Sequence, residues 1–453
     1  MKNVNKWLKG ILSYGFVAVV ALVAMSFAGC NEDPDKSLYD ALGGVSNGAT
    51  PVITSISPAV GALAGVDEIV ITGQNFSATP TDNKVQFDNA FGTIVSATST
   101  SLTVKTIRVP SDSSTVKVSV KGAPSFSNSV RYRMIAAVGT PVKFGEKDQG
   151  VVEKADPVCT EFDRDGNMFV MVKSATEGNV VMKFTKTGQD QYTYASKATA
   201  TLSSPATTQL VNMRFGWGGD LYAVNGSNRA VLVLGAKGTS ALASFTTSLA
   251  GMTSARDLDF DRFENLWVVG NSTVIFRVRK DKTTKSYTFN ANLYGTHVYN
   301  DYLYVVGSQT VATVVTQKIW RFKIDATTQD LGAAEEVFNI TSNLSEIGTA
   351  NSLTIAEDGE IILSATIPSA DVDGVASALY RISGGAATKV YDGTLDKISA
   401  INLTWSQGGT KAYYVREIKT QASGETVKVI APQTVVWVEL RKSGSTYHGR
   451  TIN

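Results

Sequence analysis

The stretch Leu-Asp-Phe-Asp-Arg-Phe-Glu-Asn-Leu-Trp-Val-Val at residues 258–269 decides the fold. It reads as an apolar strand, a short polar turn and a second strand that is apolar and aromatic. Similar stretches stand at residues 160–171 and 213–224, and weaker copies at 296–306, 352–364 and 401–415. A third strand follows each copy and alternates apolar residues with Lys or Arg. The sequence therefore predicts six copies of one β-unit.

The spacing of these units indicates how they are arranged. Their turns lie about 37 to 58 residues apart, at Gly166, Gly219, Glu264, Asp301, Gly359 and Gly409. A period of about 40 to 50 residues with three or four strands per unit is typical of propeller blades. We therefore expect residues 135–453 to form a six-bladed β-propeller, with Pro141–Phe144 adding a strand that closes the ring.

The units resemble NHL-type blades, in which an Asp-x-x-Gly-Asn turn precedes an apolar and aromatic strand. Residues 160–171 and 257–269 fit this pattern best. The last three units lack the Asn after the turn, which leaves the number of blades and their register open by about one.

Residues 51–134 have a different pattern of short, closely spaced strands. Seven strands separated by turn residues are typical of an immunoglobulin-like sandwich. The candidate strands lie at residues 52–58, 68–72, 84–87, 92–97, 101–105, 115–121 and 130–133.

Several separated segments of this region resemble the IPT/TIG domain. They are Ile56–Pro58, Val70–Phe76, Val85–Phe87, Val109–Pro110 and Ser127–Val130. The resemblance implies that the Gly-x-Asn-Phe element at residues 73–76 turns the chain sharply and buries its Phe. It also implies a spacer or protein-contact module. The whole chain is thus expected to be all-β, an immunoglobulin-like (IPT/TIG) sandwich followed by a six-bladed propeller.

The first 29 residues have the pattern of a secretory signal. Lys2, Lys6 and Lys9 precede an apolar run, and small residues lead up to Cys30. The run is short for a membrane span. Its end resembles the bacterial lipobox, which implies lipidation of Cys30 and attachment to a membrane.

Residues 30–50 read as a flexible tether. Three carboxylates follow the cysteine within residues 31–35, and Gly, Ser, Asn and Ala dominate residues 36–50. The acidic stretch resembles the surface-export signal of Bacteroidetes-type lipoproteins, which implies the outer face of the outer membrane. A plain polar linker is the alternative.

Charge and cysteine content exclude some functions. The chain has a formal charge of +2, and loss of the three lysines in residues 1–29 leaves about −1. Nucleic-acid binding requires a strongly basic face, so we expect no nucleic-acid partner. Once Cys30 is lipidated, Cys159 has no partner for a disulfide.

The ligand-binding face is harder to predict. The loops Gly307–Gln317, Thr366–Ser377 and Glu417–Gln433 are long, so the face that they build is one candidate site, with neutral drift in loop length as the alternative. Most aromatic residues fall at core positions. Trp217 lies in a Gly-rich turn, where an exposed indole would suit a sugar or a partner protein, and a cap on the propeller channel is the alternative. Tyr294 and Tyr299 are further candidates.

The sequence offers few catalytic groups, so we expect no catalytic residue, metal ligand or cofactor. His297 and His448 are the only histidines, and they lie far apart in the sequence. Asp163-Arg164-Asp165-Gly166-Asn167 resembles the start of a calcium loop but lacks the later bidentate Glu.

These observations favour a non-catalytic surface lipoprotein that binds a glycan or a partner protein. The resemblance to Bacteroidetes lipoproteins implies a role beside a TonB-dependent transporter in nutrient uptake. The alternatives are a carbohydrate-active propeller enzyme, such as a lyase or lactonase, and a structural scaffold.

Overall fold

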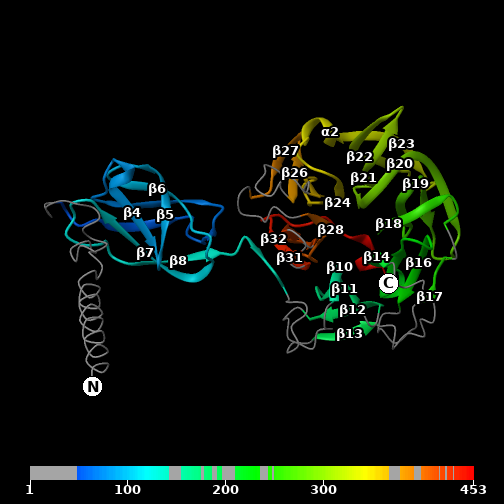
Figure 1. Ribbon diagram of the computed structural model, residues 1–453, viewed down its shortest axis with the longest axis horizontal. Helices are drawn as coiled ribbons and strands as arrows, with labels where there is room; N and C mark the ends of the chain where they lie inside the picture. The colour runs from blue at the N-terminus through cyan, green and yellow to red at the C-terminus, as the bar shows by residue number, and fades with distance from the viewer. Residues whose placement is uncertain are drawn as a thin grey trace, which may run out of the picture. The chain divides into compact units, whose positions relative to one another are not determined.

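The computed structural model describes residues 48–141, 155–174, 178–185, 191–195, 210–234, 243–246, 249–366, 378–391, 399–417, 419–423, 426–431 and 433–452. The chain divides into two compact units, Met1–Ile135 and Ala136–Asn453 (Figure 1). The predicted signal, Cys30 and most of the tether lie outside the described residues. Among the described residues, no helix is long and apolar enough to cross a membrane.

The N-terminal unit is a β-sandwich around one apolar core. Its strands follow one another in the sheet order β1-β3-β6-β5-β4-β7-β8-β2. β5 pairs with β4 at one end and with β6 at the other, so it belongs to both halves of the sandwich. The elements are β1 (Val52–Ser57), β2 (Ala62–Leu63), β3 (Glu68–Gln74), the 3₁₀ helix η2 (Pro80–Asp82), β4 (Asn83–Phe87), β5 (Ala90–Ala97), β6 (Ser101–Lys105), β7 (Ser111–Val120) and β8 (Val130–Ile135).

The Gly-x-Asn-Phe element behaves as its resemblance implies. Phe76 is buried in the core of the sandwich. Asn75 has a φ of 62°, which turns the chain, and its Nδ2 donates to the Thr50 carbonyl. A Cβ at Gly73 would lie 2.0 Å from the Val52 carbonyl oxygen, so only glycine fits there.

The second unit is a ring of antiparallel sheets around a common centre (Figure 1). Its described strands form five sheets in the ring and one separate two-stranded sheet, β30-β31. The strands are β9 (Val138–Gly139), β10 (Ala155–Phe162), β11 (Met168–Ser174), β12 (Gly178–Phe184), β13 (Gln191–Ala195), β14 (Leu210–Phe215), β15 (Leu221–Asn225), β16 (Ala230–Leu234), β17 (Ala243–Ser244), β18 (Met252–Phe260), β19 (Leu266–Val278), β20 (Thr284–Tyr299), β21 (Tyr302–Val311), β22 (Val314–Ile324), β23 (Leu331–Asn339), β24 (Ala350–Ile355), β25 (Ile361–Ala365), β26 (Leu379–Ser383), β27 (Ala386–Lys389), β28 (Ala400–Trp405), β29 (Lys411–Arg416), β30 (Lys419–Ser423), β31 (Thr426–Ala431) and β32 (Thr434–Glu439). Three short helices accompany them, namely η5 (Trp217–Gly219), α2 (Ile340–Asn343) and η6 (His448–Thr451).

The prediction of six separate blades is wrong for the described residues, because the third and fourth sequence units share one six-stranded sheet, β18–β23. β19 is 13 residues long and supplies both the second and the third strand of the third unit, whereas β20 is 16 residues long and runs from the third unit into the first strand of the fourth. The first strands of the six sequence units nevertheless follow one another around the centre. β10, β14, β18, β20, β24 and β28 each contact the next, and β28 contacts β10.

The ring closes through a strand from its N-terminal end. β9 pairs with β32, with Val138 opposite Val438 and Gly139 opposite Trp437. A Cβ on Gly139 would lie 2.5 Å from the Trp437 ring, so the indole packs directly over this glycine. The closing strand therefore precedes the predicted segment Pro141–Phe144, of which residues 142–144 lie outside the described residues.

The repeated turn is held by its first carboxylate. Asp261 Oδ1 accepts hydrogen bonds from the backbone N–H groups of Phe263 (2.9 Å) and Asn265 (2.8 Å). Its Oδ2 accepts from Asn265 Nδ2 (2.9 Å) and from Trp267 Nε1 (2.8 Å). Such a local side-chain cap replaces backbone partners that the turn itself cannot supply. This explains why the motif recurs.

Asp163 repeats this arrangement with one donor fewer. It accepts from the N–H groups of Asp165 and Asn167 and from Asn167 Nδ2 at 2.7–3.0 Å. Phe169 occupies the position that corresponds to Trp267, so no indole N–H is available.

We predict that Asp261→Ala lowers the free energy of unfolding by about 2–4 kcal/mol, because several buried donors lose their acceptor. Asp163→Ala is the matched variant and should cost about 1 kcal/mol, since Asp163 is partly exposed. Urea unfolding measures both. Equal losses would contradict the assignment of the extra stability to the Trp267 hydrogen bond and to burial.

Candidate functional site

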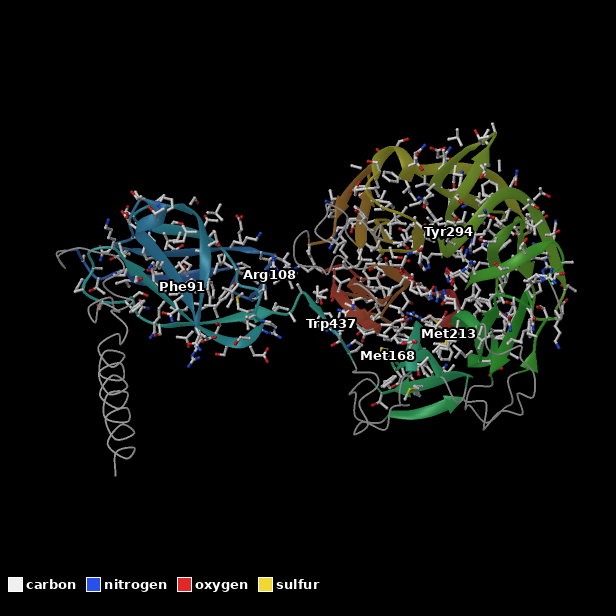
Figure 2. All side chains as sticks on the ribbon, viewed as in Figure 1. Phe91, Arg108, Met168, Met213, Tyr294 and Trp437 are labelled. Carbon is white, nitrogen blue, oxygen red and sulfur yellow. The ribbon has the colours of Figure 1, made fainter. Side chains whose placement is uncertain are left out.

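Polar side chains meet at the centre of the ring, where an apolar core would be expected. Glu161 comes from β10, Arg214 from β14, Asp257 and Asp259 from β18, and His297 from β20, and each is at most 2% exposed. Nitrogen and oxygen atoms crowd this region close to Met213 in Figure 2. Buried charges of this kind persist only when they are paired and hydrogen-bonded.

Arg214 links the carboxylates of two neighbouring strands. Its Nη1 lies 3.6 Å from Glu161 Oε2, and its Nη2 lies 3.7 Å from Asp257 Oδ1. Asn212 Nδ2 also donates to Asp257 Oδ1 at 2.6 Å, and the Thr296 N–H donates to Asp257 Oδ2 at 2.9 Å. The first strands of successive units are thus connected through side chains at the centre of the ring.

Burial and these partners shift the pKa values of the same carboxyls in opposite directions. Burial raises the pKa of Asp257 to about 6, although Arg214 and the backbone donors oppose the shift. Burial also disfavours the charge of Asp259, but its contact with His297 and the field of Arg214 hold the pKa of that carboxyl below its ordinary value. Of these two neighbouring carboxyls, Asp259 is therefore the stronger acid.

The C-terminal segment, residues 443–452, covers one end of this centre. We call this end the turn side, because the turns between the first and second strands of the units lie there. The Glu357 N–H donates to the Ser443 carbonyl, and the Ser445 N–H donates to the Ile355 carbonyl, both at 2.9 Å. A Cβ on Gly449 would lie 1.9 Å from the Phe215 carbonyl oxygen, so the backbone lies directly on the end of β14. The C-terminal ribbon, red in Figure 1, lies within the ring.

Two side chains of this segment reach the buried polar groups. Tyr447 Oη lies 2.7 Å from Thr354 Oγ1, and Arg450 Nε donates to Glu161 Oε1 at 2.6 Å. The C-terminal segment is therefore part of the core of the ring. It completes the pairing of Glu161.

Three residues have the connectivity of a Ser-His-Asp triad. Ser445 Oγ lies 2.8 Å from His297 Nε2, and Asp259 Oδ2 lies 3.0 Å from His297 Nδ1. A catalytic triad also requires an approach for substrate and donors for an oxyanion. All three residues are buried, and the Ser445 N–H is already bound to Ile355. The hydrogen bond between Ser445 and His297 attaches the C-terminal segment to β20.

A cavity of about 520 Å³ opens beside this centre. It lies on the turn side of the first two units, and Phe169, Phe215 and Ile452 provide its apolar walls. Its polar lining comes from Asp163, Arg164, Asp165, Lys183 and Arg450, and Gly218 and Gly219 complete it.

Lys183 stands between the polar and apolar parts of the cavity. Its Nζ lies 3.7 Å from Asp163 Oδ2 and 5.3 Å from the centre of the Phe169 ring. An ammonium group so loosely paired retains N–H donors for a ligand. The cavity can therefore offer hydrogen bonds beside an apolar surface.

Comparison with known protein families assigns the first unit to a domain family. Residues 51–134 match the IPT/TIG domain model. This unit is an IPT/TIG domain. No curated protein matches the sequence.

Solved structures are similar to this chain at low identity. A Bacteroides thetaiotaomicron VPI-5482 protein, whose structure carries a provisional phosphatase name, is 11% identical with a TM-score of 0.54, covering 89% of this chain and 100% of its own. An auxiliary nutrient binding protein from Bacteroides ovatus ATCC 8483 is 11% identical (TM-score 0.43; 81% of this chain, 95% of that one). A gluconolactonase from Xanthomonas campestris is also 11% identical (TM-score 0.45; 67% and 89%). The first of these likenesses shows the fold alone.

The expected exposure of Trp217 is wrong. Its side chain is 2% exposed, packs edge-on against Tyr222 and Phe260, and donates through Nε1 to the Glu264 carbonyl at 3.0 Å. The turn after β14 directs the indole inward, between the second and third units. Trp217 is a core residue, and the reason for proposing it as a ligand contact is lost.

The two tyrosines are partly buried, and neither lines the cavity. Tyr294 Oη lies 2.7 Å from Ser308 Oγ, and Tyr299 donates to the Glu357 carbonyl at 3.0 Å. Tyr294 is labelled in Figure 2. The structure does not bring Trp217, Tyr294 and Tyr299 into one site, and a ligand role for either tyrosine stays a prediction.

Two of the predicted long loops contain strands. Gly307–Gln317 is a hairpin between β21 and β22, because its β-branched residues pair, with Thr310 opposite Val315 and Val311 opposite Val314. Glu417–Gln433 contains the β30–β31 hairpin. Most of Thr366–Ser377 lies outside the described residues. The cavity opens on the opposite, turn side.

The calcium hypothesis finds no ligand set among the described residues. No group of three or more His, Cys, Asp or Glu side chains there could hold a metal ion. Asp163, its first carboxylate, is bound by the donors of its own turn.

The sequence reasoning missed the central charges, although a signal for them existed. Glu161, Arg214, Asp259 and Thr404 each come directly before a core aromatic residue, and all four are buried. In a strand, neighbours point to opposite faces, so a residue before a core aromatic points the other way. For a first strand of the ring, that direction is the centre.

We predict that the wild-type protein loses about 3 kcal/mol of stability relative to Asp257→Asn as the pH rises from 3 to 7. The unfolded carboxyl, with a pKa of 3.8, has released its proton in this window, whereas the folded one titrates only near 6. The difference should be constant above about pH 7, where the folded carboxyl is also ionised. Urea unfolding of both proteins at several pH values measures it. A difference that does not change with pH would show that the donors around Asp257 keep it ionised at pH 4.

Proposed function

We propose that this chain is a non-catalytic cell-surface binding protein whose propeller cavity takes a neutral sugar unit of a glycan. The observation that carries the proposal is the cavity beside the Asp163 turn. Its volume of about 520 Å³ falls within the range of about 300–1,000 Å³ that is typical of small-molecule sites.

The lining of the cavity suits a polyhydroxylated ring better than a strongly charged ligand. Phe169 and Phe215 offer apolar surface to the C–H face of a sugar. Lys183 and Arg164 supply donors, and the exposed Asp165 supplies acceptors, so both signs of charge are present. A neutral ligand with vicinal hydroxyls can use donors and acceptors without burying a net charge.

Membrane attachment completes the proposal. Cys30 carries the lipid, the acidic tether directs the protein to the outer face of the outer membrane, and the IPT/TIG domain separates the anchor from the propeller along the chain. In this role the protein would present glycans to a TonB-dependent transporter. The lipobox pattern and the acidic stretch at residues 31–35 support this part.

A hydrolase is the second candidate, because Ser445, His297 and Asp259 are connected as a triad. Burial of all three residues counts against it. Turnover by this triad would require the C-terminal segment to leave the centre of the ring, and Ser445 would leave with it.

We predict that residues 31–453 bind at least one neutral glycan in a calorimetric screen and that Lys183→Ala weakens the binding about tenfold or more, because a charged donor is lost. Lys318→Ala is the matched control. That lysine pairs with Glu336 on the outer strands β22 and β23, and its removal should leave the affinity unchanged.

The same glycan panel should be assayed for product and the protein treated with a serine-directed phosphonate. Binding without product or adduct is expected. Product formation together with an adduct on Ser445 would replace the binding proposal with the hydrolase, and an equal effect of Lys183→Ala and Lys318→Ala would remove the cavity from the site.

We predict that Cys30→Ala moves the protein from the membrane fraction to the soluble fraction of cells, because a single residue carries the acyl chains. Fractionation and metabolic labelling with a fatty acid measure the change. Cys159→Ala is the control, since Cys159 is buried in the ring and should not alter attachment. Continued labelling of Cys30→Ala would contradict the anchor.

A further inference from the structure

The guanidinium group of Arg450 is held in a fully formed receptor. Nε and Nη2 donate to the two carboxylate oxygens of Glu161 at 2.6 and 3.3 Å. Nη2 also donates to Thr404 Oγ1 (3.1 Å), and Nη1 donates to the Trp405 carbonyl (2.9 Å) and to Gln407 Oε1 (3.3 Å). A planar fork on a carboxylate is the strongest geometry available to this group.

An aromatic face completes the receptor. The Tyr447 ring lies 4.1 Å from the centre of the Arg450 guanidinium group, within reach of a cation–π interaction. The carboxylate, hydroxyl and carbonyl acceptors belong to β10, to β28 and to the turn after β28. All of them therefore remain in place when the Arg450 side chain is removed.

The buried carboxylate of the receptor requires a cationic partner. Glu161 is completely buried, and among the described residues Arg214 is the only cationic side chain besides Arg450 that pairs with its carboxylate, at 3.6 Å. Arg214 also faces Asp257 at 3.7 Å and donates to the Met213 carbonyl, so it cannot rotate fully toward Glu161. Without Arg450, the carboxylate would keep the distant, shared Arg214 and a long hydrogen bond from Thr404 Oγ1 (3.4 Å), and neither is a close cationic partner.

The receptor borders the cavity, although the Arg450 side chain itself is only 1% exposed. Arg450 forms part of the lining of the 520 Å³ cavity, next to Ile452 and Phe215. Shortening Arg450 would extend the cavity inward to the Glu161 carboxylate. A small planar cation could then enter along the path that the side chain occupies.

We propose that the inner end of the cavity is a guanidinium-recognition site, occupied in this chain by its own Arg450, and that it accepts a guanidinium ion when that side chain is absent. The ligand class is a guanidinium group with its planar set of N–H donors, not a cation in general. The proposal holds whether or not the outer cavity binds a sugar.

The test uses Arg450→Ala in residues 31–453, followed by thermal unfolding in tens of millimolar guanidinium chloride or sodium chloride. We expect Arg450→Ala to lower the Tm by roughly 5–10 °C, because a buried ion pair is broken. Guanidinium should raise the Tm of this variant in a saturable way, as a ligand of the folded state does. The wild-type protein should gain nothing.

Two controls separate recognition from a general salt effect. Tetramethylammonium has the charge but no N–H donor, and it should not restore Arg450→Ala. The double variant Glu161→Gln, Arg450→Ala lacks the carboxylate, and guanidinium should not raise its Tm.

The proposal is overturned if guanidinium and sodium chloride give the same Tm for Arg450→Ala, or if guanidinium raises the Tm of the double variant equally. Where Arg450→Ala does not remain folded, the yield of refolded protein in the two salts provides the same comparison. A higher yield in guanidinium supports the site, and equal yields contradict it.

Discussion

Glu161 places a carboxylate at the centre of the ring, where it is completely buried, and much of the propeller is organised around this charge. Arg450 reaches it from the C-terminal segment at 2.6 Å and Arg214 from the neighbouring strand at 3.6 Å. Leaving such a charge unpaired costs about 3–5 kcal/mol, a large part of the stability of an ordinary domain. The pairing therefore fixes the first two units and the C-terminal segment in one arrangement.

The two ends of the propeller are used in different ways to close it. At the outer edge of the last sheet, β9 pairs with β32 through backbone hydrogen bonds, and Gly139 allows the Trp437 indole to pack on it. At the centre, residues 443–452 are joined to the ring by a short backbone bridge and by the side chains of Ser445, Tyr447 and Arg450. The ring is therefore complete only when residues near both of its ends are in place.

The repeat pattern predicted the units and the cores of the units, because both are local. The Asp261 turn depends on residues within six positions, and Phe162, Phe260 and Trp405 are buried as their spacing indicates. The number of sheets could not be predicted in this way. It depends on whether β20 continues through the boundary between the third and fourth units, which the local pattern does not determine. Trp217 was misread for a related reason, since its partners Phe260 and Glu264 belong to the next unit.

The cavity arises where one unit departs from the repeat. Gly218 and Gly219 stand in the turn of the second unit, where the third unit has Phe263 and Glu264. Both glycines have a φ near +72°, and a Cβ on either would have no atom within 4 Å, so the space beside them is open. Side chains at these positions would extend into the space that Phe169, Lys183 and Ile452 surround. The Asp-capped turn stabilises the units in which it occurs. In the second unit, Gly218 and Gly219 replace this motif, and the cavity lies beside them.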